Sequence, residues 1–432
     1  MANREMKDSE IEWVGEIPND WDVKLAKRIF KREKREIFNQ EIVTAFRDGE
    51  VTQRRKRRSE GFTIATKEIG YQGVKKGDLV IHSMDAFAGA IGVSDSDGKS
   101  TPVYLVCSPK IDTDNQYYAY LLRAYSNVGY IESMAKGIRE RSTDFRFSTF
   151  SITPLIYPSL IEQQKIAAFL DEKVAHIDNI IEDTKKSIEN LKAYKQSLIT
   201  ETVTKGLDPN VEMKDSGIEW IGKIPKYWKV EKTKYSYKFN KGLSITKADL
   251  IDEGIPVINY GEIHSKYGVK FNPEKHIVKK VNPDYKRYNN ALLKYGDVIF
   301  ADTSEDIEGS GNFTTFLGET NCFAGYHTVV LKPIKRNNYI FMTYLFDSLT
   351  YRRQVRNMVQ GIKVFSITQS ILKNTYVWLP PIKEQNEIAI YLENKIPTLD
   401  KMISEKEKII EELKDYKKSL IYEYVTGKKE VK

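Results

Sequence analysis

The chain has 432 residues, of which 41% are hydrophobic and 30% are charged, and its formal net charge is +8. This composition excludes a globally disordered chain, and the length allows about two to four domains. The two cysteines, Cys107 and Cys322, exclude a disulfide framework and predict a reducing cytoplasm. We expect no signal peptide and no membrane span, because the first residues are polar and no apolar run reaches about 18 residues.

In chain order, the first element is an opening segment that occurs twice. Residues 6–31 contain IEWVGEIPNDW, and residues 213–238 contain IEWIGKIPKYW. A second matching pair closes each half, with PSLIEQQKIAAFL in residues 158–206 and PPIKEQNEIAIYL in residues 380–428. This repeat is much longer than the 20–50 residues or so of a solenoid unit, so it predicts two whole modules related by pseudo-symmetry.

Two diverged inserts lie between the repeated segments, at roughly residues 32–157 and 239–379. Short β-rich runs such as DLVIHS, PVYLVCS, IPVINY, DVIFAD and YHTVVLKP alternate there with Gly, Asn, Asp and Pro turns. Gly77 and Gly296 each precede an Asp and open a strand. Each insert then has an aromatic helical stretch, NQYYAYLLRAYSN or NNYIFMTYLFDSL. We expect each insert to be a compact α/β module with mostly antiparallel strands.

The segment that closes each half predicts a long helix with a heptad seam. The polar interruptions recur at matching places, at Thr184 and Lys195 in the first helix and at Lys406 and Lys417 in the second. We expect the two helices to pack together as a rod of about 65 Å, while two independent amphipathic helices remain the alternative. Pro397 is expected to kink or restart the second helix. The apolar seam positions are Leu170, Val174, Ile177, Ile181, Ile188, Leu191 and Leu198, then Leu392, Ile396, Leu399, Ile403, Ile410, Leu413 and Leu420.

Three segments resemble catalytic or cofactor-binding motifs without matching them in full. FAGAIG, at residues 87–92, half matches a glycine turn that holds S-adenosylmethionine, but Ile91 stands where the usual spacing has Gly. GKS, at residues 98–100, resembles the end of a phosphate-binding loop, but its upstream glycine is one residue too far away, so we expect a polar turn between strands. The Asp208…Glu212-Met213-Lys214 segment mimics a nuclease signature but lies in a linker.

Metal sites are not predicted either. The five histidines show no ligand spacing. An acidic cluster in the second insert favours a solvated face over a metal site. The members of this acidic cluster are Asp302, Glu305, Asp306 and Glu308.

Basic residues give the strongest binding signal. One group is the basic run QRRKRR, Gln53 to Arg58, and the others lie ahead of each closing helix, among Tyr and Phe residues. The planar guanidinium of arginine suits phosphates and guanine edges, so these groups predict DNA contact, with ordinary surface charge as the alternative. The candidate DNA-binding residues are Gln53, Arg54, Arg55, Lys56, Arg57, Arg58, Arg139, Arg141, Arg146, Arg352, Arg353, Arg356 and Lys363.

With these features in view, the whole chain resembles the specificity subunit of type I restriction–modification systems. The two IEW…IP…W openings, the Glu-Gln helix starts and the two Leu-Ile…Val-Thr helix ends carry the resemblance. It implies an α+β fold with two α/β target-recognition domains joined by two long antiparallel coiled-coil helices, pseudo-two-fold symmetric. The domains expected on this basis are residues 1–157, 158–206, 207–379 and 380–432.

The resemblance also implies a function. Each recognition domain would read one half of a bipartite, asymmetric site in double-stranded DNA, and the helices would fix the spacer. The chain would bind no cofactor and catalyse nothing itself. It would dock two modification subunits that methylate adenine and two ATP-dependent restriction subunits, and the complex would use S-adenosylmethionine, ATP and Mg²⁺ through these partners. A protein-binding scaffold and a stand-alone nuclease or methylase remain alternatives.

Overall fold

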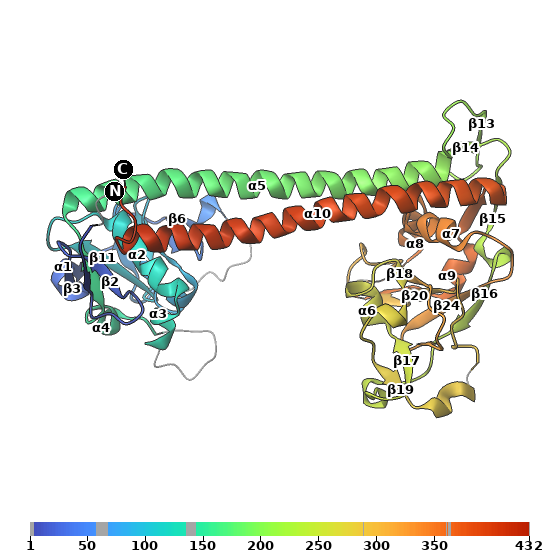
Figure 1. Cartoon of the computed structure of the whole chain (residues 1–432), viewed down its shortest axis with the longest axis horizontal. Coiled ribbons are helices and arrows are strands. Elements are labelled where there is room, and N and C mark those ends of the chain that lie inside the picture. The colour runs from blue at the N-terminus through green and yellow to red at the C-terminus, as the bar shows by residue number, and fades with distance from the viewer. Residues whose placement is uncertain are drawn as a thin grey trace. The chain divides into compact units, whose positions relative to one another are not determined.

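The chain folds into two compact units, and each contains one insert module and part of both long helices (Figure 1). Unit 1 comprises Met1–Lys185 and Glu407–Lys432, and unit 2 comprises Lys186–Lys406. The fold class is α+β, as predicted. No helix in the part of the chain that the structure describes is long and apolar enough to span a membrane. The computed structural model describes residues 4–57, 68–134, 144–287, 289–359, 361 and 364–431.

Unit 1 is built on a four-stranded antiparallel sheet with the order β4-β11-β8-β9. Helix α2 packs on this sheet and begins after Asp114, whose carboxylate accepts the N–H of Tyr117 at 2.9 Å. Tyr118 and Tyr125 of α2 are fully buried. The helices of unit 1 outside the long pair are α1 (Ala26–Ile29), α2 (Asn115–Asn127), α3 (Tyr130–Ser133) and α4 (Phe147–Phe150). Its strands are β1 (Met6–Asp8), β2 (Glu16–Pro18), β3 (Asp22–Leu25), β4 (Phe30–Arg32), β5 (Val43–Ala45), β6 (Val51–Gln53), β7 (Gln72–Val74), β8 (Leu79–His82), β9 (Ile91–Val93), β10 (Gly98–Ser100), β11 (Tyr104–Pro109) and β12 (Pro154–Tyr157).

Unit 2 contains a five-stranded sheet with the order β16-β24-β20-β22-β18, in which only the β18–β22 pairing is parallel. A second sheet has the order β19-β17-β23. The helices of unit 2 outside the long pair are α6 (Tyr260–Ser265), α7 (Tyr339–Asp347), α8 (Leu349–Met358) and α9 (Gln369–Asn374). Its strands are β13 (Met213–Asp215), β14 (Lys223–Pro225), β15 (Lys229–Lys232), β16 (Tyr237–Lys241), β17 (Ile255–Ile258), β18 (Lys270–Phe271), β19 (Lys280–Val281), β20 (Val298–Ala301), β21 (Thr303–Ser304), β22 (Phe313–Phe316), β23 (Phe323–Ala324), β24 (Thr328–Pro333), β25 (Phe365–Ser366) and β26 (Tyr376–Leu379).

The two modules share one sheet plan. The strands β4, β11, β8 and β9 of unit 1 correspond in order to β16, β24, β20 and β22 of unit 2. Their registers also correspond, since Cys107 of β11 lies opposite Leu79, and Leu331 of β24 lies opposite Val298. The internal repeat therefore extends into the inserts as structure, although their sequences have diverged.

The Gly-Asp pairs open equivalent strands in both units. Gly77 and Gly296 have φ angles of +91° and +89°, a left-handed conformation that glycine adopts without strain. Each following carboxylate, of Asp78 or Asp297, accepts the backbone N–H of the residue three positions earlier, at 2.8 and 2.9 Å. Burial raises the pKa of Asp297, although the Lys332 ammonium lies 2.7 Å away and opposes the change. These pairs anchor the central strand of each module.

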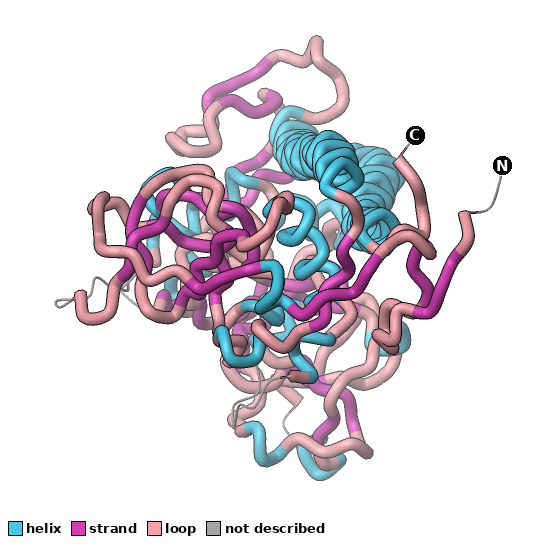
Figure 2. Tube along the Cα trace, turned by 90° about the vertical axis from the view of Figure 1, so that its left-hand side faces the viewer, coloured by secondary structure: helices cyan, strands magenta, loops and turns pink. Residues whose placement is uncertain are grey.

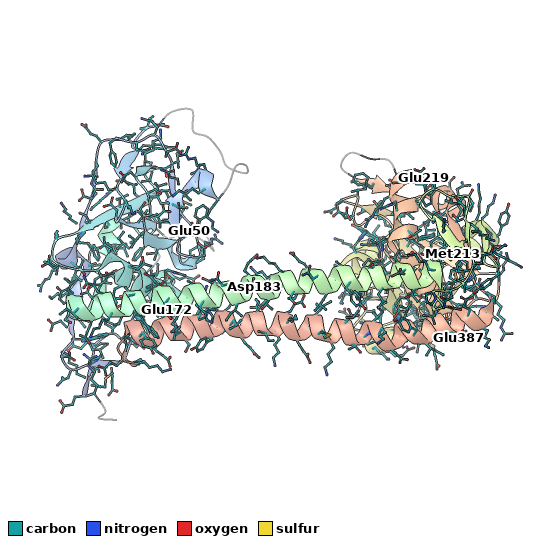
Figure 3. All side chains as sticks on the ribbon, turned by 90° about the horizontal axis from the view of Figure 1, so that it is seen from above. Glu50, Glu172, Asp183, Met213, Glu219 and Glu387 are labelled. Carbon is teal, nitrogen blue, oxygen red and sulfur yellow. The ribbon has the colours of Figure 1, made fainter. Side chains whose placement is uncertain are left out.

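The long helices are α5 (Leu160–Lys205) and α10 (Ile382–Val425). In unit 1 the start of α5 lies beside the end of α10, where the rings of Phe169 and Tyr424 are 4.4 Å apart. In unit 2 the end of α5 lies beside the start of α10, so the helices run antiparallel (Figure 3). Figure 2 shows the two long helices side by side. The seam prediction is confirmed, and the alternative of two independent helices is wrong. The buried seam residues are Leu170, Ile177, Ile181, Ile188, Leu392, Ile396, Leu399, Ile403, Ile410 and Leu420.

Two local expectations need correction. Helix α10 does not restart at Pro397, which lies inside one continuous helix, and a kink there stays a prediction. A proline inside a helix costs about 3 kcal/mol, and here the burial of the neighbouring Ile396 and Leu399 offsets that cost. GKS is not a polar turn but strand β10, which pairs with β7. Its Lys99 is 5% exposed because its ammonium donates to Gln40 Oε1 at 2.7 Å inside the module.

Candidate nucleic-acid interface

The repeated tryptophan and glutamate fasten each module to the start of a long helix. Trp21 Nε1 donates to Glu162 Oε2 at 3.0 Å, and Trp228 Nε1 donates to Glu384 Oε2 at 3.1 Å. Both indoles are 1% exposed. Burial raises the pKa of the Glu384 carboxyl. Because a buried indole N–H needs an acceptor, these repeated residues serve the fold.

The neighbouring glutamines make a second equivalent contact. Gln163 Oε1 accepts the N–H of Asp114, and Gln385 Oε1 accepts the N–H of Asn338, both at 2.9 Å. Asp114 and Asn338 are the N-caps of α2 and α7. Each glutamine Nε2 also donates to the carbonyl of the proline five residues earlier, at 2.9 Å. The Glu-Gln motif therefore ties the aromatic helix of each module to the start of α5 or α10.

Two of the predicted seam lysines form ion pairs across the two long helices. Lys195 of α5 pairs with Asp400 of α10 in unit 2, and Lys417 of α10 pairs with Asp178 of α5 in unit 1. The two pairs occupy the same positions in the two halves of the repeat. The lysine side chains are 28% and 19% exposed, so each pair contributes no more than about 0.2–1 kcal/mol. Their role is to fix the register of the seam.

The basic run lies at the surface of unit 1, where β6 ends at Gln53 and a short 3-10 turn, Arg54–Lys56, follows. Arg54 Nε donates to Thr44 Oγ1 at 3.2 Å. The other described basic residues have acidic partners in the same module. Such exposed pairs are worth about 0–1 kcal/mol, so a phosphate could replace the carboxylates at little cost. The pairs join Arg55 to Glu41, Lys56 to Asp95 and Arg57 to Asp48, at 3.0, 3.1 and 2.8 Å.

The arginines of α8 differ in exposure. Arg352 is 14% exposed and donates to both Asp347 and Asn312 at 2.9 Å. Arg356, 24% exposed, pairs with Glu308 at 3.0 Å. Arg353 is exposed. Phosphate contact by Arg352 or Arg356 would therefore require existing contacts to break, and all three remain predictions.

Arg146 is an exposed member of the predicted residues in front of the first closing helix. Its side chain is 73% exposed and pairs with Asp144 at 2.5 Å. The predicted residues Arg58, Arg139, Arg141 and Lys363 lie outside the described residues.

Each module has a polar cleft where its Gly-Asp strand ends. The unit 1 cleft, of about 420 Å³, lies where β8 ends, and the unit 2 cleft, of about 710 Å³, lies where β20 ends. Apart from Arg146, the sequence did not predict a binding role for the residues of these clefts, because those of each cleft come from four separate segments of the chain. The repeated Gly-Asp pair was the one signal that could have located them. The polar lining residues of the unit 1 cleft include Ser83, Asp144 and Arg146, and those of the unit 2 cleft include Asp302, His327, Ser366 and Gln369.

The acidic cluster of unit 2 is occupied by contacts within the protein. Asp302 Oδ1 lies 3.1 Å from His327 Nδ1, Asp306 Oδ1 accepts the N–H of Gly309 at 2.6 Å, and Glu308 pairs with an arginine. Within the described ranges, no group of three or more His, Cys, Asp and Glu side chains could hold a metal ion.

The FAGAIG segment does not form a cofactor turn. A Cβ added to Gly92 would lie 2.0 Å from the carbonyl oxygen of Gly49, so this glycine allows two backbone segments to approach each other. Ile91 is fully buried in β9. The residues of this segment therefore do not fit S-adenosylmethionine.

Known proteins are similar to this chain in sequence and in fold. Residues 225–415 match the family model described as the type I restriction modification DNA specificity domain. The MjaVIII specificity subunit of Methanocaldococcus jannaschii is 27% identical over 77% of this chain and 74% of its own length. The putative MjaX specificity subunit of the same organism is 26% identical over 97% of this chain and 96% of its own length.

Two solved structures share the fold. A chain from a structure on the complex assembly and conformational transition of a type I restriction–modification system aligns with a TM-score of 0.70 and 13% identity, over 95% of this chain and 99% of that chain. The HsdS subunit of Thermoanaerobacter tengcongensis aligns with a TM-score of 0.51 and 14% identity, over 95% of this chain and 98% of that chain.

Two modules with one sheet plan, each fastened by the same contacts to a pair of antiparallel helices, define a two-module recognition protein. In sequence and in fold, the chain is similar to type I restriction–modification specificity subunits.

Proposed function

We propose that each recognition module reads one half of a bipartite, asymmetric DNA site. The observation that carries this proposal is the combination of one maintained plan with two diverged surfaces. The sheet order, the Trp–Glu bonds and the glutamine contacts recur in both units. The loops between them do not recur in sequence, so the two modules would recognise different half-sites.

The two long helices are proposed to set the spacer between the half-sites. Each helix has residues in both units, and α5 alone has 46 residues, which corresponds to about 69 Å at about 1.5 Å per residue. The cross-helix ion pairs fix the register of the seam in both units. A rod with a fixed register would hold the number of unread base pairs constant.

The chemistry of the complex is proposed to belong to partner subunits. Two modification subunits would methylate adenine with S-adenosylmethionine, and two restriction subunits would use ATP and Mg²⁺. The chain itself would supply recognition without catalysis, since its cofactor-like and nuclease-like segments are used within the fold or the linker. The purified chain should therefore neither methylate nor cut DNA.

A module exchange tests the proposal. The chain is co-expressed with a type I modification subunit in a host without other adenine methylation, and the methylated motif is mapped by methylome sequencing. Replacing residues 32–157 by the insert of a related subunit should change one half of the motif and leave the other half and the gap unchanged. Replacing residues 239–379 should change the other half alone. A change in both halves after a single exchange would refute independent reading.

A further inference from the structure

We propose that the unit 1 cleft and the unit 2 cleft are the base-reading sites of the two modules, and that each receives base edges from the major groove of duplex DNA. This inference rests on the proposed function, because it names the part of each module that makes the specific contacts. It is carried by an equivalence between the clefts that the two sequences do not reveal.

The first equivalence is a backbone hydrogen bond at the end of the Gly-Asp strand. The residue that follows β8, Ser83, donates its N–H to the carbonyl of Val103 at 3.0 Å. The residue that follows β20, Asp302, donates its N–H to the carbonyl of His327, also at 3.0 Å. Val103 and His327 each directly precede the next strand of the sheet, β11 or β24. The same bond therefore closes one side of both clefts.

The second equivalence is a hydrogen bond to a segment that comes much later in the chain. The N–H of Phe145 donates to the carbonyl of Ser83 at 3.1 Å, and the N–H of Ile367 donates to the carbonyl of Asp302 at 2.8 Å. Phe145 and Ile367 are each 1% exposed, so buried side chains anchor this segment in both units. Three chain segments thus meet in the same way in each module.

These two backbone hydrogen bonds form a frame that both clefts have in common. The side chains on this frame differ in chemistry between the clefts. A maintained frame with changed donors and acceptors is what two modules need in order to read different base pairs. The difference cannot come from strand register, because the frame bonds correspond one to one. The equivalent pairs are Ser83 and Asp302, Val103 and His327, Asp144 and Ser366, and Arg146 and Thr368.

His327 adds an independent observation in the unit 2 cleft. Its φ angle is +55°, a left-handed conformation that residues other than glycine rarely adopt. The turn is held by Thr328 Oγ1, which donates to the carbonyl of Gly325 at 2.7 Å, and by the N–H of Tyr326, which donates to Asn259 Oδ1 at 3.2 Å. The His327 ring is nevertheless 56% exposed beside Asp302. Backbone strain of this kind, held by surrounding bonds, clusters at functional sites.

One exposed charged group in each cleft indicates what that cleft would read, although Arg32 and Asp144 also line the unit 1 cleft and Lys241 also lines the unit 2 cleft. Arg146, 73% exposed at the unit 1 cleft, has the planar donor fork that suits O6 and N7 of guanine. In the unit 2 cleft, Asp302 supplies an acceptor that suits the amino group of cytosine or adenine, with His327 beside it. We therefore expect a guanine in the half-site of unit 1 and an amino-bearing base at the equivalent point in the half-site of unit 2.

The test uses the full chain in complex with modification subunits, and the probe is a library of duplexes with both half-sites randomised. The bases accepted at each position are read from the methylated products. The unit 2 variants are Asp302→Asn, His327→Gly and His327→Asn, and the unit 1 variant is Arg146→Ala. Glycine and asparagine both tolerate a left-handed φ, so the His327 variants remove the ring without adding backbone strain. Asp252→Asn, on an aspartate that is 90% exposed and does not line the cleft, is the matched control in unit 2.

We expect each unit 2 variant to reduce base discrimination about 5- to 150-fold at one position of one half-site, with the other half-site and the gap unchanged. Arg146→Ala should do the same in the other half-site, and the control should match the wild type. The thermal unfolding of His327→Gly should be unchanged or shifted upward.

Three outcomes would overturn the inference. One is a wild-type complex with a bipartite motif that no cleft variant alters, which would leave the proposed function intact. Another is loss of methylation at every site in a normally folded variant, which would assign the cleft a general positioning role. The third is a wild-type motif that is not bipartite, which would remove the proposed function as well.

Discussion

Exchanging the charges of the cross-helix ion pairs tests the antiparallel register directly. Asp178→Lys and Lys195→Asp on α5 would turn the two attractive pairs, one in each unit, into two repulsive pairs. The side chains are partly exposed, so each pair contributes no more than about 0.2–1 kcal/mol, and the repulsion adds a similar amount. We therefore expect the free energy of unfolding to fall by about 1 kcal/mol in each unit. For units of this size, that lowers Tm by about 2–4 °C.

The matching exchange on α10, Asp400→Lys with Lys417→Asp, should cause the same loss alone and should restore stability when combined with the α5 exchange. Thermal and urea unfolding of the four proteins gives the coupling energy. The coupling should weaken at high salt. As a control, exchanging Lys401 with Glu405, which lie 3.8 Å apart on α10, should not couple to α5. If the combined variant stays as unstable as either single exchange, the register described above is wrong.

Three further predictions concern DNA contact, spacing and pH. Neutralising the four arginines of the basic run should weaken DNA binding and reduce the log–log salt slope by roughly 0.9 for each arginine that contacts phosphate, and an unchanged slope would assign the run to ordinary surface charge. Inserting one heptad after Ile188 and one after Ile410 should keep the seam in register and lengthen the rod by about 10 Å, so methylome mapping should show the same half-sites with a gap up to about three base pairs longer. Burial lowers the pKa of His82, whose Nδ1 accepts the N–H of Asp85 at 3.0 Å, and Asp85 only partly opposes that shift. His82 therefore contributes stability above its unfolded pKa of about 6.5, and this stability is lost as pH falls through the lower folded value. His82→Gln should remove that part of the pH dependence of Tm. His176→Gln, at an exposed position of α5, should not remove it.

The parts of the fold that the sequence predicted are those with a local or repeated signal. The heptad spacing identified the seam of α5 and α10, and the Gly-Asp pairs identified equivalent strands in both modules. GKS was misread because a polar tripeptide is typical of a turn, whereas Lys99 is buried by partners that lie far away in sequence. The restart expected at Pro397 was wrong because propensity describes an isolated helix, and packing of the neighbouring residues overrides it here.

The clefts could not be predicted for a related reason, which also explains why they can differ between the modules. Stability in each unit comes from buried groups that are alike in both, such as Trp21 and Trp228 with their glutamate acceptors. The frame of each cleft consists of backbone hydrogen bonds, so changing the side chain of Ser83 or Asp302 leaves those hydrogen bonds in place. At an exposed cleft position such as Arg146, whose side chain is 73% exposed, a substitution usually changes stability by less than about 0.5 kcal/mol. Recognition chemistry can therefore change while the frame that positions it stays the same. A sequence comparison of the two halves detects the repeated tryptophans and glutamates but not the clefts.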